Sequence, residues 1–310
     1  MSNNVLCTLV VPTILIDISM LFFLFLMFKK LINKFCRSAL LMLLMQIFLT
    51  DPFFAEVVSV KTELDVKKIL DKTTKKTLIL FDIDYLLLHP EKEFLQMGAL
   101  KHHNEVVSWN LNRLSPSEQD VVVSAMLSLE PSLVLSPALI KKIQLMKKNK
   151  RTVIGISSEL TGPVDLAEKK SVSMMAEKLQ KLKRHGIYFS SSHEPIILDT
   201  VTASKGAHPV FKNGVIFTNG ERTPRGDIIK NFLEKFKGVE KFDSILYIGD
   251  KQANCQEIYE EFSELTKPKF KKITVLYFNK ALSFPEKQTE TVPFERKFIE
   301  FIRSTKIAAS

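Results

Sequence analysis

Two aspartates, Asp82 and Asp84, stand one residue apart at the end of the apolar run TLILFDID, residues 77–84. Carboxylates at the tip of a buried strand are costly unless they are paired, hydrogen-bonded or bound to a metal ion. Two neighbouring carboxylates can supply a nucleophile and a general acid or base. A strand that simply ends in a turn shows the same D-x-D pattern, so these residues do not identify a site by themselves.

Two further apolar runs of the chain also end in polar residues, Ser157 and Ser158 after one and Asp250 after the other. If these runs are parallel strands, their carboxyl ends meet at the edge of the sheet where such folds bind ligands. Three carboxylates at one edge would repel one another unless a divalent cation bound them, and oxygen ligands alone favour Mg²⁺. We therefore expect a Mg²⁺ site formed by Asp82, Asp84 and Asp250.

The elements that would position these side chains alternate between apolar runs and amphipathic helical stretches. Continuous apolar runs, typical of strands buried on both faces of a parallel sheet, span 77–84, 151–158, 186–191, 244–250 and 271–278. One helical stretch between them opens with Thr223-Pro224 and closes at Gly238. Segment 211–221 contains Asn-Gly twice and predicts a hairpin. The alternating order predicts an α/β fold with a doubly wound, mainly parallel sheet.

The interval 85–150 is longer than one crossover helix requires. Its last part predicts that crossover helix, with Ser136 as N-cap and Pro137 at the first helical position. The earlier part, about 90–135, has a mostly helical pattern and would lie over the carboxyl edge of the sheet. Because open α/β sheets bind ligands outside that edge, we expect a small helical cap inserted after the first strand.

In their order along the chain, the motifs FDID, GISS and YIGDKQAN resemble those of the haloacid dehalogenase-like superfamily, in particular its exported bacterial members. The resemblance covers about 76–285 and implies a Rossmann-like fold and hydrolysis of a phosphorylated substrate through an aspartyl-phosphate on Asp82. It also implies that Asp84 is the general acid and base and that Ser157 hydrogen-bonds the phosphoryl oxygens. Asp250 would hold Mg²⁺ together with Asp82 and the backbone carbonyl of Asp84.

Three positions depart from the pattern of that superfamily. Leu86 stands where a threonine is usual, and Gly249 precedes Asp250 where a second aspartate is usual. The basic residue that neutralises the phosphoryl charge is either Arg225 or Lys230, with Lys205-Gly206 as a further candidate. Two hypotheses follow: a Mg²⁺-dependent phosphatase, or a catalytically weakened domain that binds a phosphorylated ligand or a protein partner.

The N-terminal region predicts a hydrophobic leader. Residues 5–28 are long enough to span a bilayer, and Asp17 is their only charged residue. Read from Met27, a basic cluster and a shorter apolar stretch lead to a signal-peptide cleavage site after Ala55. We expect a leader over 1–55, as a transmembrane segment, a signal peptide or both. The domain 56–310 would then be exported, periplasmic or secreted, or anchored to the membrane by its N-terminus.

Composition excludes several other classes of protein. A hydrophobic content of 45% is that of a folded chain rather than a disordered one. The net charge of +10 comes from lysines that are interspersed with glutamates, which is typical of solvated helix faces. No aromatic–basic RNA motif or Cys/His finger accompanies this charge, so nucleic acid is not an expected partner. The three cysteines form no disulfide framework and no zinc-ligand spacing.

Overall fold

The computed structural model describes residues 54–166, 171–191, 194–201, 207–263, 270–287 and 289–305. The predicted leader lies outside these residues except for its last two positions, and Lys205 and Gly206 also lie outside them. Within the described ranges, no helix has the length and apolar character needed to cross a bilayer.

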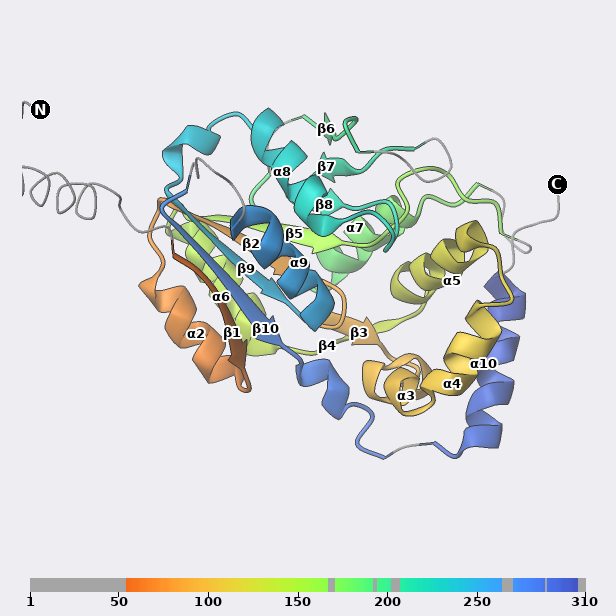
Figure 1. Cartoon of the computed structure of the whole chain (residues 1–310). Helices are drawn as coiled ribbons and strands as arrows, with labels where there is room; N and C mark the ends of the chain where they lie inside the picture. The colour runs from red at the N-terminus through yellow and green to blue at the C-terminus, as the bar shows by residue number, and fades with distance from the viewer. Residues whose placement is uncertain are drawn as a thin grey trace, which may run out of the picture. The chain divides into compact units, whose positions relative to one another are not determined.

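A largely parallel sheet forms the centre of the described structure (Figure 1). Its eight strands among the described residues have the order β1-β10-β9-β2-β5-β8-β7-β6. They are Phe54–Val60 (β1), Thr77–Asp82 (β2), Thr152–Ser157 (β5), Ile196–Ile197 (β6), Val210–Lys212 (β7), Val215–Phe217 (β8), Ser244–Gly249 (β9) and Lys272–Phe278 (β10). In this sheet β7 runs antiparallel to both of its neighbours, and the other pairs are parallel. The prediction of an α/β protein with a mostly parallel central sheet is confirmed.

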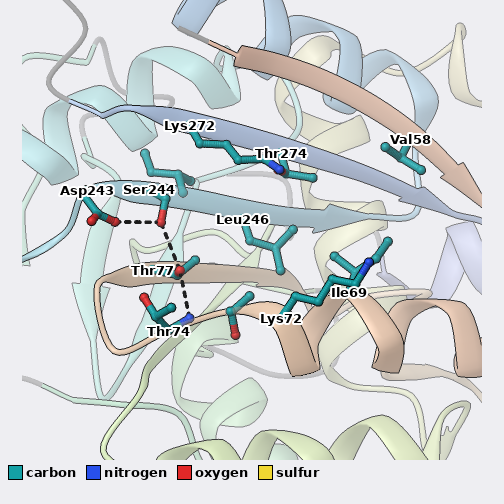
Figure 2. Close-up of a pocket in the computed structure, with 12 residues that line it drawn as sticks. Val58, Ile69, Lys72, Thr74, Thr77, Asp243, Ser244, Leu246, Lys272 and Thr274 are labelled. Atoms are coloured by element: carbon teal, nitrogen blue, oxygen red, sulfur yellow. Dashed lines mark hydrogen bonds between the residues drawn. The ribbon is translucent and has the colours of Figure 1, made fainter. Parts of the chain in front are cut away.

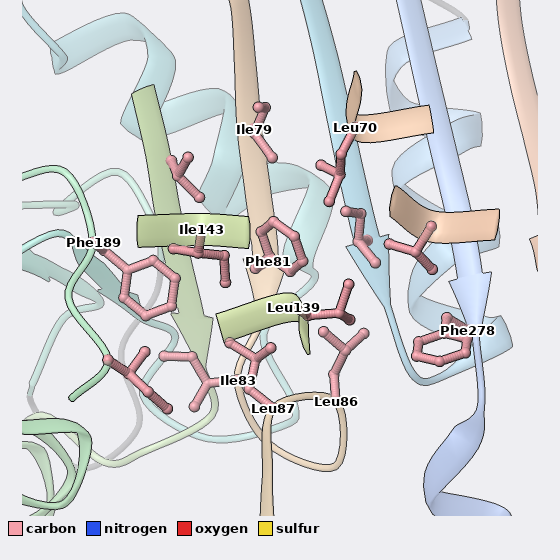
Figure 3. Close-up of a cluster of buried hydrophobic side chains, with 14 of the residues drawn as sticks. Leu70, Ile79, Phe81, Ile83, Leu86, Leu87, Leu139, Ile143, Phe189 and Phe278 are labelled. Carbon is pink, nitrogen blue, oxygen red and sulfur yellow. The ribbon is translucent and has the colours of Figure 1, made fainter. Parts of the chain in front are cut away.

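Helices cover both faces of the sheet. Three of them, α2 (Glu63–Lys72), α6 (Pro137–Lys148) and α7 (Met174–Arg184), contribute buried residues to one apolar cluster, drawn in part in Figure 3. The opposite face packs against α8 (Arg225–Lys235) and α9 (Gln252–Ser263) in a second cluster. The short 3-10 turns η3 (Val239–Lys241) and η4 (Lys280–Ser283) follow α8 and β10. This layering places β2 between helices on both faces, which is why all six of its residues are buried.

The predicted helix boundaries near the site are close to the observed ones. Helix α6 begins at Pro137 directly after Ser136, and α8 begins at Arg225 directly after Pro224. After α8 the chain turns through Gly238, whose φ of 89° lies in the left-handed region that favours glycine. The proline at each start lies within one residue of its predicted position, and Gly238 follows the last residue of α8 by three positions.

One strand prediction was wrong, and two strands of this sheet, β1 and β6, were not predicted. Segment 186–191 is not a strand; instead Ile187 and Phe189 pack into the apolar cluster on the face of the sheet. Its place beside β5 is taken by β8, which belongs to the predicted hairpin with β7. The turn of that hairpin is Asn213-Gly214, with φ values of 51° and 82°. Because β1 was not predicted, the expected boundary between residues 55 and 56 falls inside a strand that pairs with β10.

The interval predicted as an insertion forms a helical layer with a small sheet at its base. It contains β3 (Leu88–Pro90), η1 (Glu93–Leu95), α3 (Met97–His102), α4 (Asn104–Leu111), α5 (Pro116–Ser128) and β4 (Ser132–Val134). Strands β3 and β4 pair antiparallel, so the helices lie between the two strands of one ribbon. The C-terminal helix α10 (Thr291–Thr305) packs on α4 and α5 and shares their apolar cluster, a contribution that the sequence did not predict.

Candidate functional site

A small cavity lies where β2, β5 and β9 end. About 10 Å³ of it is open to the centre of a water molecule, enough for about one water. Its lining is almost entirely polar or charged: Asp82, Asp84, Tyr85, Ile156, Ser158, Glu221, Arg225, Asp250 and Lys251. The carboxylates predicted to converge at this edge therefore do lie around one space. These carboxylates lie close together because β2 pairs in parallel with both β5 and β9, so the carboxyl ends of the three strands lie at the same edge of the sheet.

The carboxylate of Asp82 is buried and bonded at both oxygens. Arg225 donates from Nη1 to Oδ1 at 2.5 Å, and the Tyr247 hydroxyl donates to Oδ2 at 2.6 Å. Burial raises the pKa of Asp82, and the charge of Arg225 and the hydrogen bond from Tyr247 oppose that rise. Each carboxylate oxygen has a second lone pair, so Asp82 can still present an oxygen to a ligand in the cavity.

Of the two basic residues predicted from α8, Arg225 belongs to this site and Lys230 does not. Besides Asp82, the Arg225 guanidinium reaches Ser158 Oγ at 2.9 Å and Glu221 Oε1 at 3.9 Å. Lys230 lies five positions further along α8, is 46% exposed in its side chain and pairs with Glu261 on α9. Of these two residues, Arg225 alone lines the cavity. A buried guanidinium beside Asp82 offers paired N–H donors that suit a phosphoryl group.

Asp84 lines the cavity and also belongs to a second polar cluster, formed with Ser157, Lys178 and Glu159. Its Oδ2 accepts a hydrogen bond of 2.8 Å from the Ser157 hydroxyl, and its Oδ1 accepts one from the ammonium of Lys178 on α7. Lys178 also pairs with Glu159 Oε1 at 2.8 Å. Ser157, predicted to bind phosphoryl oxygens, thus orients Asp84, while the neighbouring Ser158 lines the cavity with Arg225.

Asp250 carries the least compensated charge among these groups. Its Oδ2 is buried and has no hydrogen-bond partner in the described residues, and the same holds for Nδ2 of Asn254 in the first turn of α9. Burial, and next the charge of Asp82, raise the pKa of Asp250 from 3.8 to about 8. A carboxylate in this position stabilises the folded chain only if a cation or a proton neutralises it.

The donors at this edge suit a hard divalent cation. No group of three or more His, Cys, Asp or Glu side chains is arranged for a metal ion within the described ranges. Mg²⁺ commonly binds to only one or two carboxylates and completes its shell with water and substrate phosphates. The uncompensated oxygen of Asp250 and the charge of Asp82 beside it fit that requirement.

The turn after the aspartates differs from the expected one. Tyr85 has a φ of 57°, an uncommon backbone conformation for a large side chain, and its hydroxyl donates to the Leu95 carbonyl at 3.1 Å. Leu86, where a hydroxyl was expected, is fully buried and belongs to the same apolar cluster as Leu139 and Phe278 (Figure 3). A threonine at this position would place its hydroxyl in an apolar environment, which accounts for the leucine.

Several residues of the site were missed because they have no sequence signal of their own. Tyr247 is one of the apolar-looking residues of β9, yet its hydroxyl reaches Asp82. The structure does offer a reason for Gly249, since a Cβ added there would lie 2.7 Å from the Tyr247 hydroxyl oxygen. Lys178 and Glu159 were also missed, because a lysine in a basic amphipathic helix and a glutamate after a strand both predict exposure.

Two further residues that line the cavity, Lys251 and Glu221, form an ion pair. Lys251 donates to Glu221 Oε2 at 2.7 Å, and both residues line the cavity. Lys251 and Arg225 lower the pKa of Glu221 from 4.5 to about 2, so this carboxylate is ionised at neutral pH. The cavity therefore contains alternating acidic and basic groups rather than a field of one sign.

A larger cavity, of about 410 Å³, lies at the opposite, amino-terminal edge of the sheet (Figure 2). It is lined by the hydroxyls of Thr77 and Ser244, by Lys72 and Lys272 and by apolar residues. The Thr77 and Ser244 oxygens lie 3.0 Å apart, and Ser244 also bonds Asp243. The Thr77 and Ser244 hydroxyls therefore already have hydrogen-bond partners within the protein. Because the carboxyl edge has a buried carboxylate oxygen without a partner, we place the candidate site there.

Fold and site together define an α/β protein with a site lined by acidic and basic side chains at the carboxyl edge of a mostly parallel sheet. The chain belongs to the family described as "Protein of unknown function (DUF2608)", whose model matches residues 59–291. That range contains β2, β5, β9 and every residue of the cavity. A comparison with curated proteins finds none that matches the chain.

Proposed function

We propose that the protein is a Mg²⁺-dependent phosphoester hydrolase that acts through an aspartyl-phosphate on Asp82, like enzymes of the haloacid dehalogenase-like superfamily that its motifs resemble. The observation that carries the proposal is the gathering of Asp82, Asp84, Arg225 and Asp250 around one cavity at the carboxyl edge of the sheet. This set combines a carboxylate nucleophile, a second carboxylate and a guanidinium, which is what phosphoryl transfer through a covalent intermediate requires.

The contacts of Asp82, Asp84 and Arg225 suggest which part of the reaction each residue would perform. An oxygen of Asp82 attacks phosphorus, and the leaving group departs with a proton supplied through Asp84. Arg225, already bonded to Asp82 and Ser158, would hold the phosphoryl oxygens beside the nucleophile. Water then attacks the phosphorus, and Asp84 accepts its proton while Asp82 is released.

Mg²⁺ would be held by Asp250, by Asp82 and by the backbone carbonyl of Asp84, and it would neutralise charge on the transferred group. The uncompensated Oδ2 of Asp250 supports this assignment. The helices between β3 and β4 would act as a small cap that selects the substrate. We also propose that residues 1–55 direct export or tether the domain to a membrane.

A second candidate function is binding without turnover, to a phosphorylated ligand or a protein partner. Two observations favour it. Leu86 packs in the apolar cluster in place of the usual hydroxyl. Arg225 and Tyr247 hold both oxygens of Asp82, so a ligand must compete with two hydrogen bonds to reach the nucleophile.

A phosphatase assay on the full chain separates the two functions. Wild type would be incubated with p-nitrophenyl phosphate and a panel of alkyl phosphates, with Mg²⁺ or with EDTA. The phosphatase predicts turnover that needs Mg²⁺ and falls by at least about 10³-fold in Asp82→Asn, because the nucleophile is lost. Asp227→Asn is the matched control, since Asp227 is an exposed carboxylate in the first turn of α8. Absence of turnover on every substrate, with Mg²⁺ or phosphate still bound, would favour the binding function.

A further inference from the structure

Two lysines of α7 point into the interior of the protein instead of into solvent. Lys178 is fully buried and Lys181, three positions later, is 4% exposed. Both ammonium groups donate to the carbonyl of Leu127 in the last turn of α5, at 2.9 and 2.7 Å. Buried lysines of this kind need full compensation, and each of these obtains part of it from the C-terminal end of the inserted helix.

Their remaining partners differ. Lys181 donates to a second backbone carbonyl, that of Glu130, at 2.6 Å. Lys178 instead contacts two carboxylates, Asp84 and Glu159. Lys181 therefore only anchors α5, whereas Lys178 joins α5 to a carboxylate of the candidate site.

Glu159 completes the cluster from the other side. It is fully buried, and its Oε2 accepts a hydrogen bond of 2.5 Å from Ser124 on α5. The same Ser124 oxygen accepts from the backbone N–H of Leu160 at 3.1 Å. Lys178 is thus held in place by Glu159 and Leu127, so its ammonium presents a fixed donor to Asp84. With Ser157 on the other oxygen, the direction of the carboxylate's remaining lone pairs is set.

We propose that Lys178 is a positioning residue that aims the Asp84 carboxylate at the water that hydrolyses the phosphorylated enzyme. The inference rests on the proposed function and names the step that Lys178 serves. In that step a water oxygen forms a bond to phosphorus while the bond from phosphorus to the Asp82 oxygen breaks. The water proton passes to Asp84, and the products are free Asp82 carboxylate and inorganic phosphate. A general base of this kind must be held within hydrogen-bond reach of the water.

The test separates the two half-reactions in rapid-mixing experiments with p-nitrophenyl phosphate and Mg²⁺. Release of p-nitrophenolate reports formation of the phosphoenzyme, and the steady-state rate reports its hydrolysis. In Lys178→Met we expect the initial burst to persist, because p-nitrophenolate leaves as a stable anion that needs no proton from Asp84. The steady-state rate should fall at least about ten-fold, because the base that activates water is misplaced. The acid-quenched variant should carry more phosphoryl group than wild type, removable by hydroxylamine. Lys181→Met, at a lysine that is also buried and bonds the same Leu127 carbonyl, should match wild type within about two-fold.

A double variant controls for a folding defect in Lys178→Met. Lys178→Met with Glu159→Gln removes one positive and one negative charge, so the formal charge of the buried cluster is unchanged, and it should show the same rise in phosphoenzyme. Equal losses of burst and steady-state rate in the Lys178 variants, or no loss, would overturn the role of Lys178 while the proposed function stands. If wild type forms no phosphoenzyme and no product, the proposed function fails and this inference fails with it.

Discussion

Substitution of Asp250 by asparagine should stabilise the protein and change how its stability depends on pH. Asn has nearly the same shape as Asp but carries no charge. The variant therefore removes the carboxylate whose Oδ2 is buried without a partner and whose neighbour is Asp82. The geometry of the cavity is retained, so the comparison isolates the charge.

The magnitude follows from the raised pKa. Asp250 titrates near 3.8 when unfolded and at about 8 when folded, so between these values the folded chain binds the extra proton. Stability then falls as pH rises through this window, because the unfolded state is the one that ionises more readily. With 1.36 kcal/mol per pKa unit, this group costs about 4 kcal/mol of unfolding free energy between pH 5 and pH 8. Because Asp250→Asn has no carboxylate at this position, its unfolding free energy does not fall for this reason.

The assay is thermal unfolding of wild type and Asp250→Asn between pH 5 and pH 8, in EDTA. We expect the stability advantage of the variant to grow by about 10 °C between pH 5 and pH 8, from about 2–4 °C per kcal/mol for a domain of this size. Other titrating groups are common to both proteins and cancel in the difference. Asp227→Asn, at an exposed site, should follow wild type at every pH.

Parallel midpoints of wild type and Asp250→Asn over the whole range would refute the reasoning, because Asp250 would then carry no charge penalty in the fold. A second experiment repeats the unfolding measurements with Mg²⁺ in place of EDTA. The cation should raise the wild-type midpoint most at pH 8, where Asp250 is ionised, and should leave Asp250→Asn unchanged. An equal Mg²⁺ effect on both proteins would place the cation elsewhere.

The remaining predictions concern the groups around Asp82. Tyr247→Phe removes a buried hydrogen bond to a carboxylate and should lower the unfolding free energy by about 1.5–3 kcal/mol, measured by urea titration. Retained stability would show that the bond does not form. Arg225→Lys keeps the charge but cannot bridge Asp82 and Ser158 together, so phosphate affinity or turnover should fall about ten- to a hundred-fold. Lys230→Met should alter neither quantity, because Lys230 pairs with Glu261 on the surface; a loss comparable to that of Arg225→Lys would contradict the assignment of the basic residue.

Much of the fold follows from local signals in the sequence. Continuous apolar runs identified β2, β5, β9 and β10, because a strand buried on both faces has no polar alternation. Asn213-Gly214 identified the hairpin, because both residues tolerate positive φ. Segment 186–191 was misread for a related reason: Ile187 and Phe189 are apolar because they pack on the sheet, not because they extend it. Periodicity alone does not distinguish these two cases.

By itself, the sequence determined that aspartates and a serine would lie at the ends of three strands, because strand ends and their order along the chain are local properties. Only the tertiary structure decided which groups touch them. Arg225 rather than Lys230 reaches Asp82 because the first turn of α8 lies at the cavity and the next turn faces α9. Lys178 and Tyr247 reach the aspartates across about 94 and 165 residues of chain, a separation that no local pattern encodes. That Asp82 and Asp84 would meet Asp250 at one edge of the sheet was therefore predictable, and the partners of these carboxylates were not.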